Sequence, residues 1–163
     1  MPTMKELMRV LAKNNVSFEV LDHKPTISAH QIAVVTHNRD SDVAKVVIIE
    51  ADGKFWMTVS RADQRVSERL LRARLGAKTV RLAREEDFAQ LFPGCDLGAM
   101  PPFGNLYGLP VLVDEEIACN ENILFSACER TRALRIRYQD YKRIVHPMVA
   151  DFAELPNLEE HAE

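Results

Sequence analysis

The chain has 163 residues and a formal net charge of −3, with 47% hydrophobic and 28% charged residues. A chain of this length forms one domain and buries about two thirds of its unfolded surface. The composition is that of a soluble globular protein without a signal-type or transmembrane-length apolar run, so we expect a cytoplasmic protein. One domain is expected over residues 1–155, followed by a flexible tail over 156–163. The negative charge gives no global argument for nucleic-acid binding.

The cysteines favour a reducing environment. Cys95, Cys119 and Cys128 form no Cys-x-x-Cys pair, and an odd number cannot be fully paired within one chain. We therefore expect reduced thiols that serve mainly in packing, with a nucleophilic cysteine as the alternative.

The N-terminal part predicts a helix, a short strand and a second helix. Thr3 and Glu6 have the spacing of a capping box, and the apolar residues that follow recur at helical spacing. The segment 18–21 is typical of a strand, and the capping pattern recurs at Ser28 before a second apolar helix.

A β-hairpin is predicted next. Two β-rich segments, 43–50 and 55–60, flank Asp52-Gly53, the dipeptide that best supplies the positive φ angles of a two-residue turn. In that register Lys45 lies opposite Ser60.

Lys45 stands in the most apolar, β-branched run of the chain. A lysine is rarely buried without a partner, so it either faces water at a strand end or lines a cleft. Because side chains alternate along a strand, Lys45 shares its face with Thr58 and Ser60. This face is a candidate site.

The remaining elements indicate an α+β domain. An amphipathic helix is predicted over 63–75, where Gly76 occupies the place of a left-handed C-terminal cap. Shorter elements follow without a regular strand–helix repeat: strands at 79–82, 111–113, 123–125, 134–136 and 149–152, and helices at 85–91 and 139–145. We expect helices flanking a mixed, largely antiparallel curved sheet.

Bases outnumber acids between residues 61 and 84. Such a run is usually a solvated helix face, and a surface that follows phosphate groups is the alternative.

A glycine- and proline-rich loop is the second candidate site. Glycines let the backbone approach a ligand and expose its amides, while adjacent prolines stiffen the loop. The loop is therefore able to hold an oxyanion or a carboxylate, and a rigid turn is the alternative. Its residues include Gly98, Ala99, Met100, Pro102, Phe103 and Gly104.

Other catalytic motifs are absent from the sequence. His23, His30 and His37 recur every seven residues but lack an acid-flanked zinc pattern, so a metal-dependent hydrolase is only a third hypothesis. The sequence also lacks a nucleophile elbow, a P-loop and a dinucleotide fingerprint.

Four motifs occur together in this chain. They are Ala44-Lys45 at the head of an apolar strand, the Gly-x-x-x-Pro-Phe-Gly loop at 98–104, Leu109-Pro110-Val111-x-Val113-Asp114 and His23-x-Pro25-Thr26. With these motifs, from about Phe18 to Phe152, the chain resembles the YbaK/EbsC-like aminoacyl-tRNA deacylases, also called the prolyl-tRNA-synthetase-associated editing domain.

The resemblance implies a trans-editing enzyme of compact α+β fold that hydrolyses the ester of a mischarged tRNA, of the prolyl type. Lys45 corresponds to the functional lysine of the family, and Gly98 and Pro102 to the ends of its substrate loop. The implied partners are aminoacyl-tRNA and an aminoacyl-tRNA synthetase, and no cofactor, metal or membrane is implied. Within the basic run, Arg65, Arg69 and Arg72 are the predicted contacts to the acceptor stem of the tRNA. Besides the loop, the predicted substrate contacts are Thr58 and Ser60, from the hairpin register, together with Ser126, Arg130 and His23.

The chain departs from the family at two positions. Many members carry glycine and histidine where Cys128 and Arg130 stand here. This change leaves a second hypothesis open, a module of the same fold that binds tRNA or a nucleotide without catalysis. Arg130 then holds a phosphate or an acidic group, or is a surface arginine.

Overall fold

The computed structural model describes residues 3–156 and places ten strands and six α-helices within them. The strands are β1 (Glu19–Asp22), β2 (Ala44–Ala51), β3 (Lys54–Arg61), β4 (Arg65–Val66), β5 (Val80–Leu82), β6 (Val111–Asp114), β7 (Asn122–Ser126), β8 (Arg132–Arg137), β9 (Met148–Ala150) and β10 (Ala153–Glu154). The helices are α1 (Met4–Lys13), α2 (Ala29–Thr36), α3 (Glu68–Leu75), α4 (Glu85–Phe88), α5 (Glu115–Ala118) and α6 (Tyr138–Val145). Three 3-10 helices are η1 (Asp40–Asp42), η2 (Ala89–Leu91) and η3 (Gly104–Tyr107).

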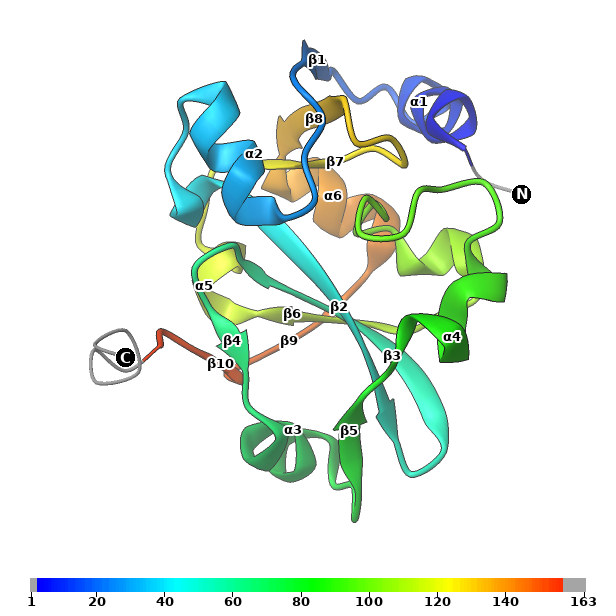
Figure 1. Cartoon of the computed structure of the whole chain (residues 1–163), viewed down its shortest axis with the longest axis vertical. Helices are drawn as coiled ribbons and strands as arrows, with labels where there is room; N and C mark the ends of the chain where they lie inside the picture. The colour runs from blue at the N-terminus through cyan, green and yellow to red at the C-terminus, as the bar shows by residue number, and fades with distance from the viewer. Residues whose placement is uncertain (1–2, 157–163) are drawn as a thin grey trace.

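The strands form three sheets within residues 3–156. The central sheet has the order β5-β2-β3-β6-β9, a second sheet has the order β1-β8-β7, and β10 pairs with β4. In the described sheets only the β3–β6 and β6–β9 pairings are parallel. Figure 1 shows the β1-β8-β7 sheet with α1 and α2 at one end of the molecule and α3 with β5 at the other. The predicted mixed, largely antiparallel α+β fold is confirmed.

The β2–β3 hairpin has the predicted register. Lys45 lies opposite Ser60, and Val47 lies opposite Thr58. Asp52 and Gly53 at the turn have φ angles of 48° and 82°, as a type I′ turn requires. The Asp52-Gly53 turn alone was therefore sufficient to predict which residue lies opposite Lys45.

The helix predicted over 63–75 begins later than expected. Ser67 caps α3 by accepting the Leu70 amide at 3.1 Å, and β4 before it pairs with β10 near the C-terminus. This long-range pairing overrides the local helical pattern, whereas Gly76 ends the helix in the left-handed region as predicted. The strand predicted over 149–152 overlaps β9 and ends earlier than expected, and the separate strand β10 follows at Ala153.

Both faces of the central sheet are covered. One face of β2, with Ala44 and Ile48, packs in a large core together with α1 and α6. The opposite face, with Ile49 and Ala51, packs against a smaller cluster that includes Leu71 of α3. Lys45 lies on this second face, because it is an even number of residues from Ile49.

No helix within residues 3–156 is long and apolar enough to cross a membrane. The predicted tail falls, from residue 157 onward, outside the described residues.

Candidate functional site

Lys45 lies in a part of β2 where one edge of the strand has no paired neighbour. On the side opposite β3, β5 pairs with β2 only over residues 49–51. A single bridge from Val43 to Leu124 continues the contact toward β7. Along the described chain, residues 44–48 of β2 therefore have no strand neighbour on that side. Lys45, in this stretch, is half-buried.

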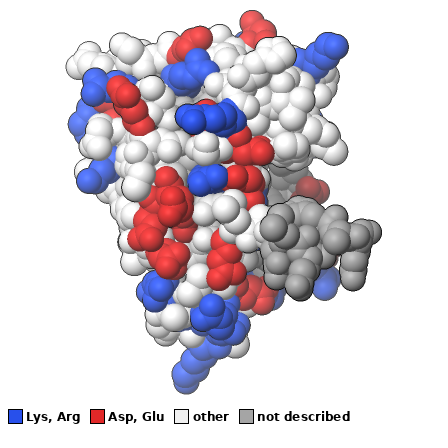
Figure 2. Space-filling view, turned by 90° about the vertical axis from the view of Figure 1, so that its left-hand side faces the viewer, with Lys and Arg blue, Asp and Glu red and all other residues white. Residues whose placement is uncertain are grey.

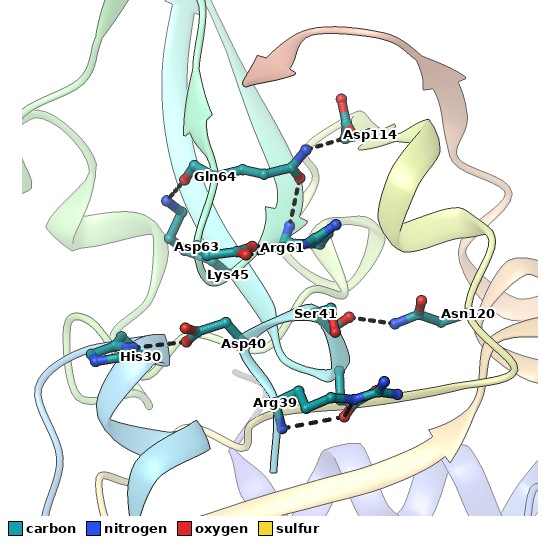
Figure 3. A network of polar contacts seen from close by, with 11 residues as sticks. His30, Arg39, Asp40, Ser41, Lys45, Arg61, Asp63, Gln64, Asp114 and Asn120 are labelled. Carbon is teal, nitrogen blue, oxygen red and sulfur yellow. Dashed lines mark hydrogen bonds and ion pairs between the residues drawn. The ribbon is translucent and has the colours of Figure 1, made fainter. Parts of the chain in front are cut away.

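A main-chain carbonyl holds the Lys45 ammonium. Its Nζ donates a hydrogen bond to the main-chain oxygen of Gln64, which lies in the turn between β3 and β4 (Figure 3). The Gln64 side chain closes this turn, because its Oε1 accepts the Arg61 amide at 3.1 Å. Its Nε2 donates to Asp114 at 3.5 Å, and Gln64 is almost completely buried. Gln64 thus aims the carbonyl that orients Lys45.

Asp114 anchors this arrangement from the end of β6. Its carboxylate is completely buried and accepts the amides of Glu116 at 3.0 Å, Phe152 at 3.0 Å and Ala153 at 2.9 Å. A buried carboxylate needs such donors, and these tie the break between β9 and β10 to the turn that contacts Lys45. Asp114 was predicted only as part of a family motif, and its position directly after an apolar strand was the available signal.

Burial and two neighbouring charges change the pKa of Lys45. Burial lowers this pKa, the charge of Asp63 raises it, and the charge of Arg65 lowers it again. The net direction is downward, as expected for an ammonium that is partly removed from water. Asp63 itself is held by Arg61 through two hydrogen bonds of 3.0 and 2.7 Å.

The smaller of two cavities at Lys45 brings the strand and the predicted loop together. It has a volume of about 220 Å³. Its lining residues are Ile27, Ser28, Ala29, Ala44, Lys45, Val46, Gly98, Met100 and Ser126. The predicted site residues Lys45, Gly98, Met100 and Ser126 therefore share one cavity. Sequence reasoning missed Ile27, Ser28 and Ala29, which reach it only because α2 begins beside the loop.

Gly98 shapes the loop at the cavity. Its φ angle of 89° lies in a region that residues with a side chain rarely adopt. An ammonium, a hydroxyl and a loop backbone around a small apolar space are suited to hold a polar carbonyl compound and to stabilise negative charge that develops on it.

The other predicted loop residues support the loop from behind. Pro102 accepts a 2.6 Å hydrogen bond from the Tyr141 hydroxyl, and Phe103 packs edge-on against the same ring. A Cβ on Gly104 would meet a Val111 methyl at 2.7 Å, so only glycine fits there. Ala99 is buried too, and these four residues do not line the cavity.

The structure corrects the expected state of two cysteines. Cys95 and Cys128 form a disulfide 33 residues apart in sequence, whereas Cys119 is free and exposed. Two main-chain hydrogen bonds bring the segments together: Asp96 to Cys128 at 2.9 Å, and Cys128 to Ala99 at 2.8 Å. The spacing of cysteines in sequence cannot reveal this proximity. Cys128 also has a φ angle of 71°, a conformation that glycine adopts most easily.

Arg130 and His23 do not line the smaller cavity. Exposed Arg130 donates to the Leu97 carbonyl at 3.0 Å and so braces the start of the loop. His23 contacts the Lys24 carbonyl through Nδ1 at 2.7 Å.

Thr58 and Ser60 are completely buried and line neither cavity at Lys45. They lie on β3 opposite Val47 and Lys45, as the predicted register requires, but their side chains are not part of either cavity wall. The Thr58 hydroxyl donates to the Val47 carbonyl at 2.7 Å, across the hairpin.

The three histidines do not converge. His30 contacts Asp40 at 2.8 Å (Figure 3), while His37 ends α2 with a φ angle of 57°. No group of three metal-binding side chains occurs in the part of the chain that the structure describes.

A larger cavity of about 610 Å³ also opens at Lys45. Its lining residues are Lys45, Val47, Arg65, Val66, Ser67, Glu68, Leu82, Glu154 and Leu155. Of the arginines predicted to contact tRNA, Arg65 lies here, and Arg69 approaches Glu154 at 3.9 Å. The half-buried Arg72 is on α3 and outside this lining.

The basic run does not form a uniformly positive face. Arg81 pairs with both Glu50 and Asp87, and Arg74 lies 3.7 Å from Asp151. Figure 2 shows acidic and basic side chains interspersed on the viewed face, with basic ones gathered at the lower end, the level of α3 in Figure 1.

Comparison with protein families decides the classification. The profile of the aminoacyl-tRNA editing domain family matches residues 23–144, which include Lys45 and the whole loop. The chain belongs to the aminoacyl-tRNA editing domain family. No curated protein sequence matches it.

Solved structures share the fold of this editing domain. A hypothetical protein is 20% identical with a TM-score of 0.82, over 91% of this chain and 99% of that chain. A proposed trans-editing enzyme for prolyl tRNA synthetase is 17% identical with a TM-score of 0.80, over 94% and 98%. A proposed signal transduction protein of Marinobacter aquaeolei is 17% identical with a TM-score of 0.68, over 94% of this chain and 31% of that chain.

Proposed function

We propose that this editing domain hydrolyses the ester of mischarged tRNA in trans, on a tRNA of the prolyl type. The observation that carries the proposal is that Lys45, Gly98, Met100 and Ser126 line one small cavity. The family match and the fold shared with a proposed prolyl-tRNA trans-editing enzyme support it. Charged tRNAs circulate in the cytoplasm, where we place the activity, free or beside a synthetase.

The proposed chemistry is ester hydrolysis without a catalytic triad. A water molecule, which a neighbouring hydroxyl of the terminal ribose orients, attacks the carbonyl carbon, and its proton passes to the ribose oxygen that leaves. The bond between this carbon and the ribose oxygen then breaks, and the ribose oxygen leaves as a hydroxyl. The Lys45 ammonium and loop backbone amides stabilise the negative charge that develops on the carbonyl oxygen. Because aminoacyl esters are already labile, positioning and electrostatics suffice.

The cavity volume sets the class of amino acid. Its volume of about 220 Å³ is below the roughly 300–1,000 Å³ of typical ligand pockets. Alanine, valine and methionine side chains form much of its wall. We therefore expect a small side chain on the misattached amino acid.

A panel of charged tRNAs tests the proposal. Purified protein is incubated with mischarged prolyl-tRNAs and with other aminoacyl-tRNAs, and ester loss is compared with the spontaneous rate. We expect faster loss for mischarged prolyl-tRNA that carries a small amino acid. If the whole panel decays at the spontaneous rate while an active family member clears it, the proposed activity is wrong.

A binding module without turnover is the second candidate, and Cys128 and Arg130 favour it. Both replace common family residues, and both fasten the loop that faces Lys45. This candidate predicts that tRNA binds to the protein without ester cleavage, and that Lys45→Ala leaves this binding unchanged.

A further inference from the structure

The disulfide joins two parts of the wall of the smaller cavity. Cys95 lies three residues before Gly98, and Cys128 lies two residues after Ser126. Gly98 and Ser126 both line this cavity. The covalent bond therefore limits how far the loop can move away from the end of β7. The redox state of the two sulfurs thus bears directly on the shape of the cavity.

Hydrogen bonds hold the same two segments together independently of the sulfurs. The Asp96 amide donates to the Cys128 carbonyl at 2.9 Å, and the Cys128 amide donates to the Ala99 carbonyl at 2.8 Å. The Arg130 side chain donates to the Leu97 carbonyl at 3.0 Å. Because these bonds do not require the disulfide, we expect reduction to loosen the loop and to leave the fold intact.

The two sulfurs differ in their access to solvent. Cys128 is 2% exposed, whereas Cys95 is half-buried. In thiol–disulfide exchange a thiolate attacks one sulfur, and the other sulfur departs as a thiolate. A reductant in solution therefore reaches the Cys95 sulfur first, and the Cys128 sulfur is the one that departs.

The Tyr107 hydroxyl lies beside both sulfurs, 3.1 Å from Cys95 Sγ and 3.4 Å from Cys128 Sγ. Disulfide sulfurs carry no hydrogen, so the hydroxyl is the donor in these contacts. Burial raises the pKa of Tyr107 to about 12, so the hydroxyl keeps its proton at neutral pH. A donor in this position stabilises the thiolate that departs from a buried site.

We propose that Cys95 and Cys128 form a reversible redox site that regulates the smaller cavity, which is tightened in the oxidised form and loosened in the reduced form. The effect on activity rests on the proposed function, whereas the redox reaction itself does not. Disulfides are rare in the cytoplasm, where we place the activity, and those that occur there are usually transient, catalytic or redox-sensing. A disulfide at the cavity wall is accounted for in this way.

A dithiol reductant supplies the electrons for the opening reaction. One thiolate of the dithiol attacks the Cys95 sulfur, the bond between Cys95 and Cys128 breaks, and Cys128 departs as a thiolate that takes up a proton. The second thiol of the reductant then attacks the mixed disulfide and releases Cys95, which also takes up a proton. Two electrons and two protons thereby pass to the protein, and the dithiol becomes a disulfide. Glutathione disulfide carries out the reverse oxidation and becomes two molecules of glutathione.

A redox titration tests the site without any ester chemistry. The full chain is equilibrated in buffers of glutathione and glutathione disulfide at different ratios, and its thiols are alkylated and located by mass spectrometry. We expect Cys95 and Cys128 to change together in one two-electron transition, while Cys119 joins no disulfide within the chain. A disulfide that does not form in excess glutathione disulfide, or that excess dithiothreitol does not reduce in the folded protein, overturns the redox site.

Methionine methyl signals in NMR spectra report the effect on the cavity. Met100 lines the smaller cavity, and Met148 on β9 is the control. We expect the Met100 signal to shift or broaden when the wild type is reduced, and the Met148 signal to stay in place. A Met100 signal that is unchanged after complete reduction overturns the regulation of the cavity.

Cys128→Gly and Cys119→Ala form a matched pair of variants. Glycine suits the φ angle of 71° at position 128, so the first variant removes the disulfide without backbone strain, while Cys119 is a free, exposed thiol. For the wild type and Cys119→Ala, we expect reduction to raise the KM for mischarged tRNA at least about threefold, because a loosened loop must be ordered when substrate binds. Cys128→Gly is expected to have the higher KM in both buffers. No response in the wild type, or an equal response in Cys128→Gly, contradicts the regulation.

The outcomes separate the two proposals. If the disulfide titrates and its reduction changes the Met100 signal, but mischarged tRNA is stable in both forms, the redox site is retained and hydrolysis is wrong. If mischarged tRNA is cleared with the same KM in both forms, hydrolysis is retained and the regulation is wrong.

Discussion

At the scale of single residues, Lys45 combines a charged group with an apolar strand. Its cross-strand register was predictable, because the Asp52-Gly53 turn determines which residues of the hairpin lie opposite each other. Its hydrogen-bond partner was not predictable. The acceptor is the main-chain oxygen of Gln64, which has no side-chain signature in a sequence. The burial of Thr58 and Ser60 was also hidden, because it depends on segments that pack over them from elsewhere.

The pH dependence of activity is expected to report the charge of Lys45. The ammonium is present below the folded-state pKa of Lys45 and is lost as the pH rises through it. Because burial lowers this pKa, activity above the spontaneous rate is expected to decline below the ordinary titration range of lysine. Asp63 raises the pKa, so Asp63→Asn is expected to move the decline to lower pH.

Rates of ester loss, measured between neutral and alkaline pH and corrected for spontaneous hydrolysis, check this prediction. Asp22→Asn is the control, because Asp22 pairs with Arg132 on a different sheet. An alkaline limb that coincides for the wild type and both variants would show that Asp63 does not act on the catalytic charge.

At the scale of elements, the loop geometry depends on α6. The Tyr141 hydroxyl donates to Pro102 in the buried core, and burial raises the pKa of Tyr141 so that the hydroxyl remains a donor. Tyr141→Phe leaves this carbonyl without its donor and is expected to cost about 1–3 kcal/mol of unfolding free energy. It is also expected to raise the KM for mischarged tRNA, because the loop is less firmly held.

Tyr138 on the same helix provides the matched control. Its buried hydroxyl has no hydrogen-bond partner among the described residues, so Tyr138→Phe is expected to change stability by less than about 0.5 kcal/mol. Urea unfolding of both variants measures the difference. Equal losses would mean that the Tyr141 hydrogen bond does not stabilise the loop.

Local signals identified the ends of several elements. The capping residues Thr3 and Ser28 begin α1 and α2, and Gly76 ends α3, as predicted. The predicted start of α3 was wrong, because the residues before the helix form β4, which pairs with a strand nearly ninety residues later. Patterns within a short window do not contain such a pairing.

At the scale of the whole molecule, the site is assembled from segments that are distant in sequence. The smaller cavity takes residues from the start of α2, from β2, from the 98–104 loop and from the end of β7. The predicted site residues belong to three of these segments, and the fold was needed to add the start of α2. Ion pairs also join distant segments, since Glu154 and Asp151 lie beside Arg69 and Arg74 of α3.

The disulfide is a second long-range link with a measurable consequence. In the chain-entropy description, a closed loop of 33 residues contributes about 3–4 kcal/mol to the unfolding free energy. Cys95→Ala is expected to lose approximately this amount, whereas Cys119→Ala, at an exposed free thiol, is expected to lose little. A thiol count in denaturant without reductant is expected to find one reactive group. Three reactive groups would contradict the disulfide.

The central claim is that Lys45 is the catalytic charge of an editing deacylase. The most direct measurement is the rate of ester loss from mischarged prolyl-tRNA with the wild type, Lys45→Ala and Lys54→Ala. Lys54 is the matched control, an exposed lysine in the same hairpin whose ammonium lies 5.4 Å from the Trp56 ring. We expect Lys45→Ala to remain folded and to lose about 10²–10³-fold in rate, and Lys54→Ala to match the wild type. A folded Lys45→Ala protein that clears the ester at the wild-type rate would contradict the claim.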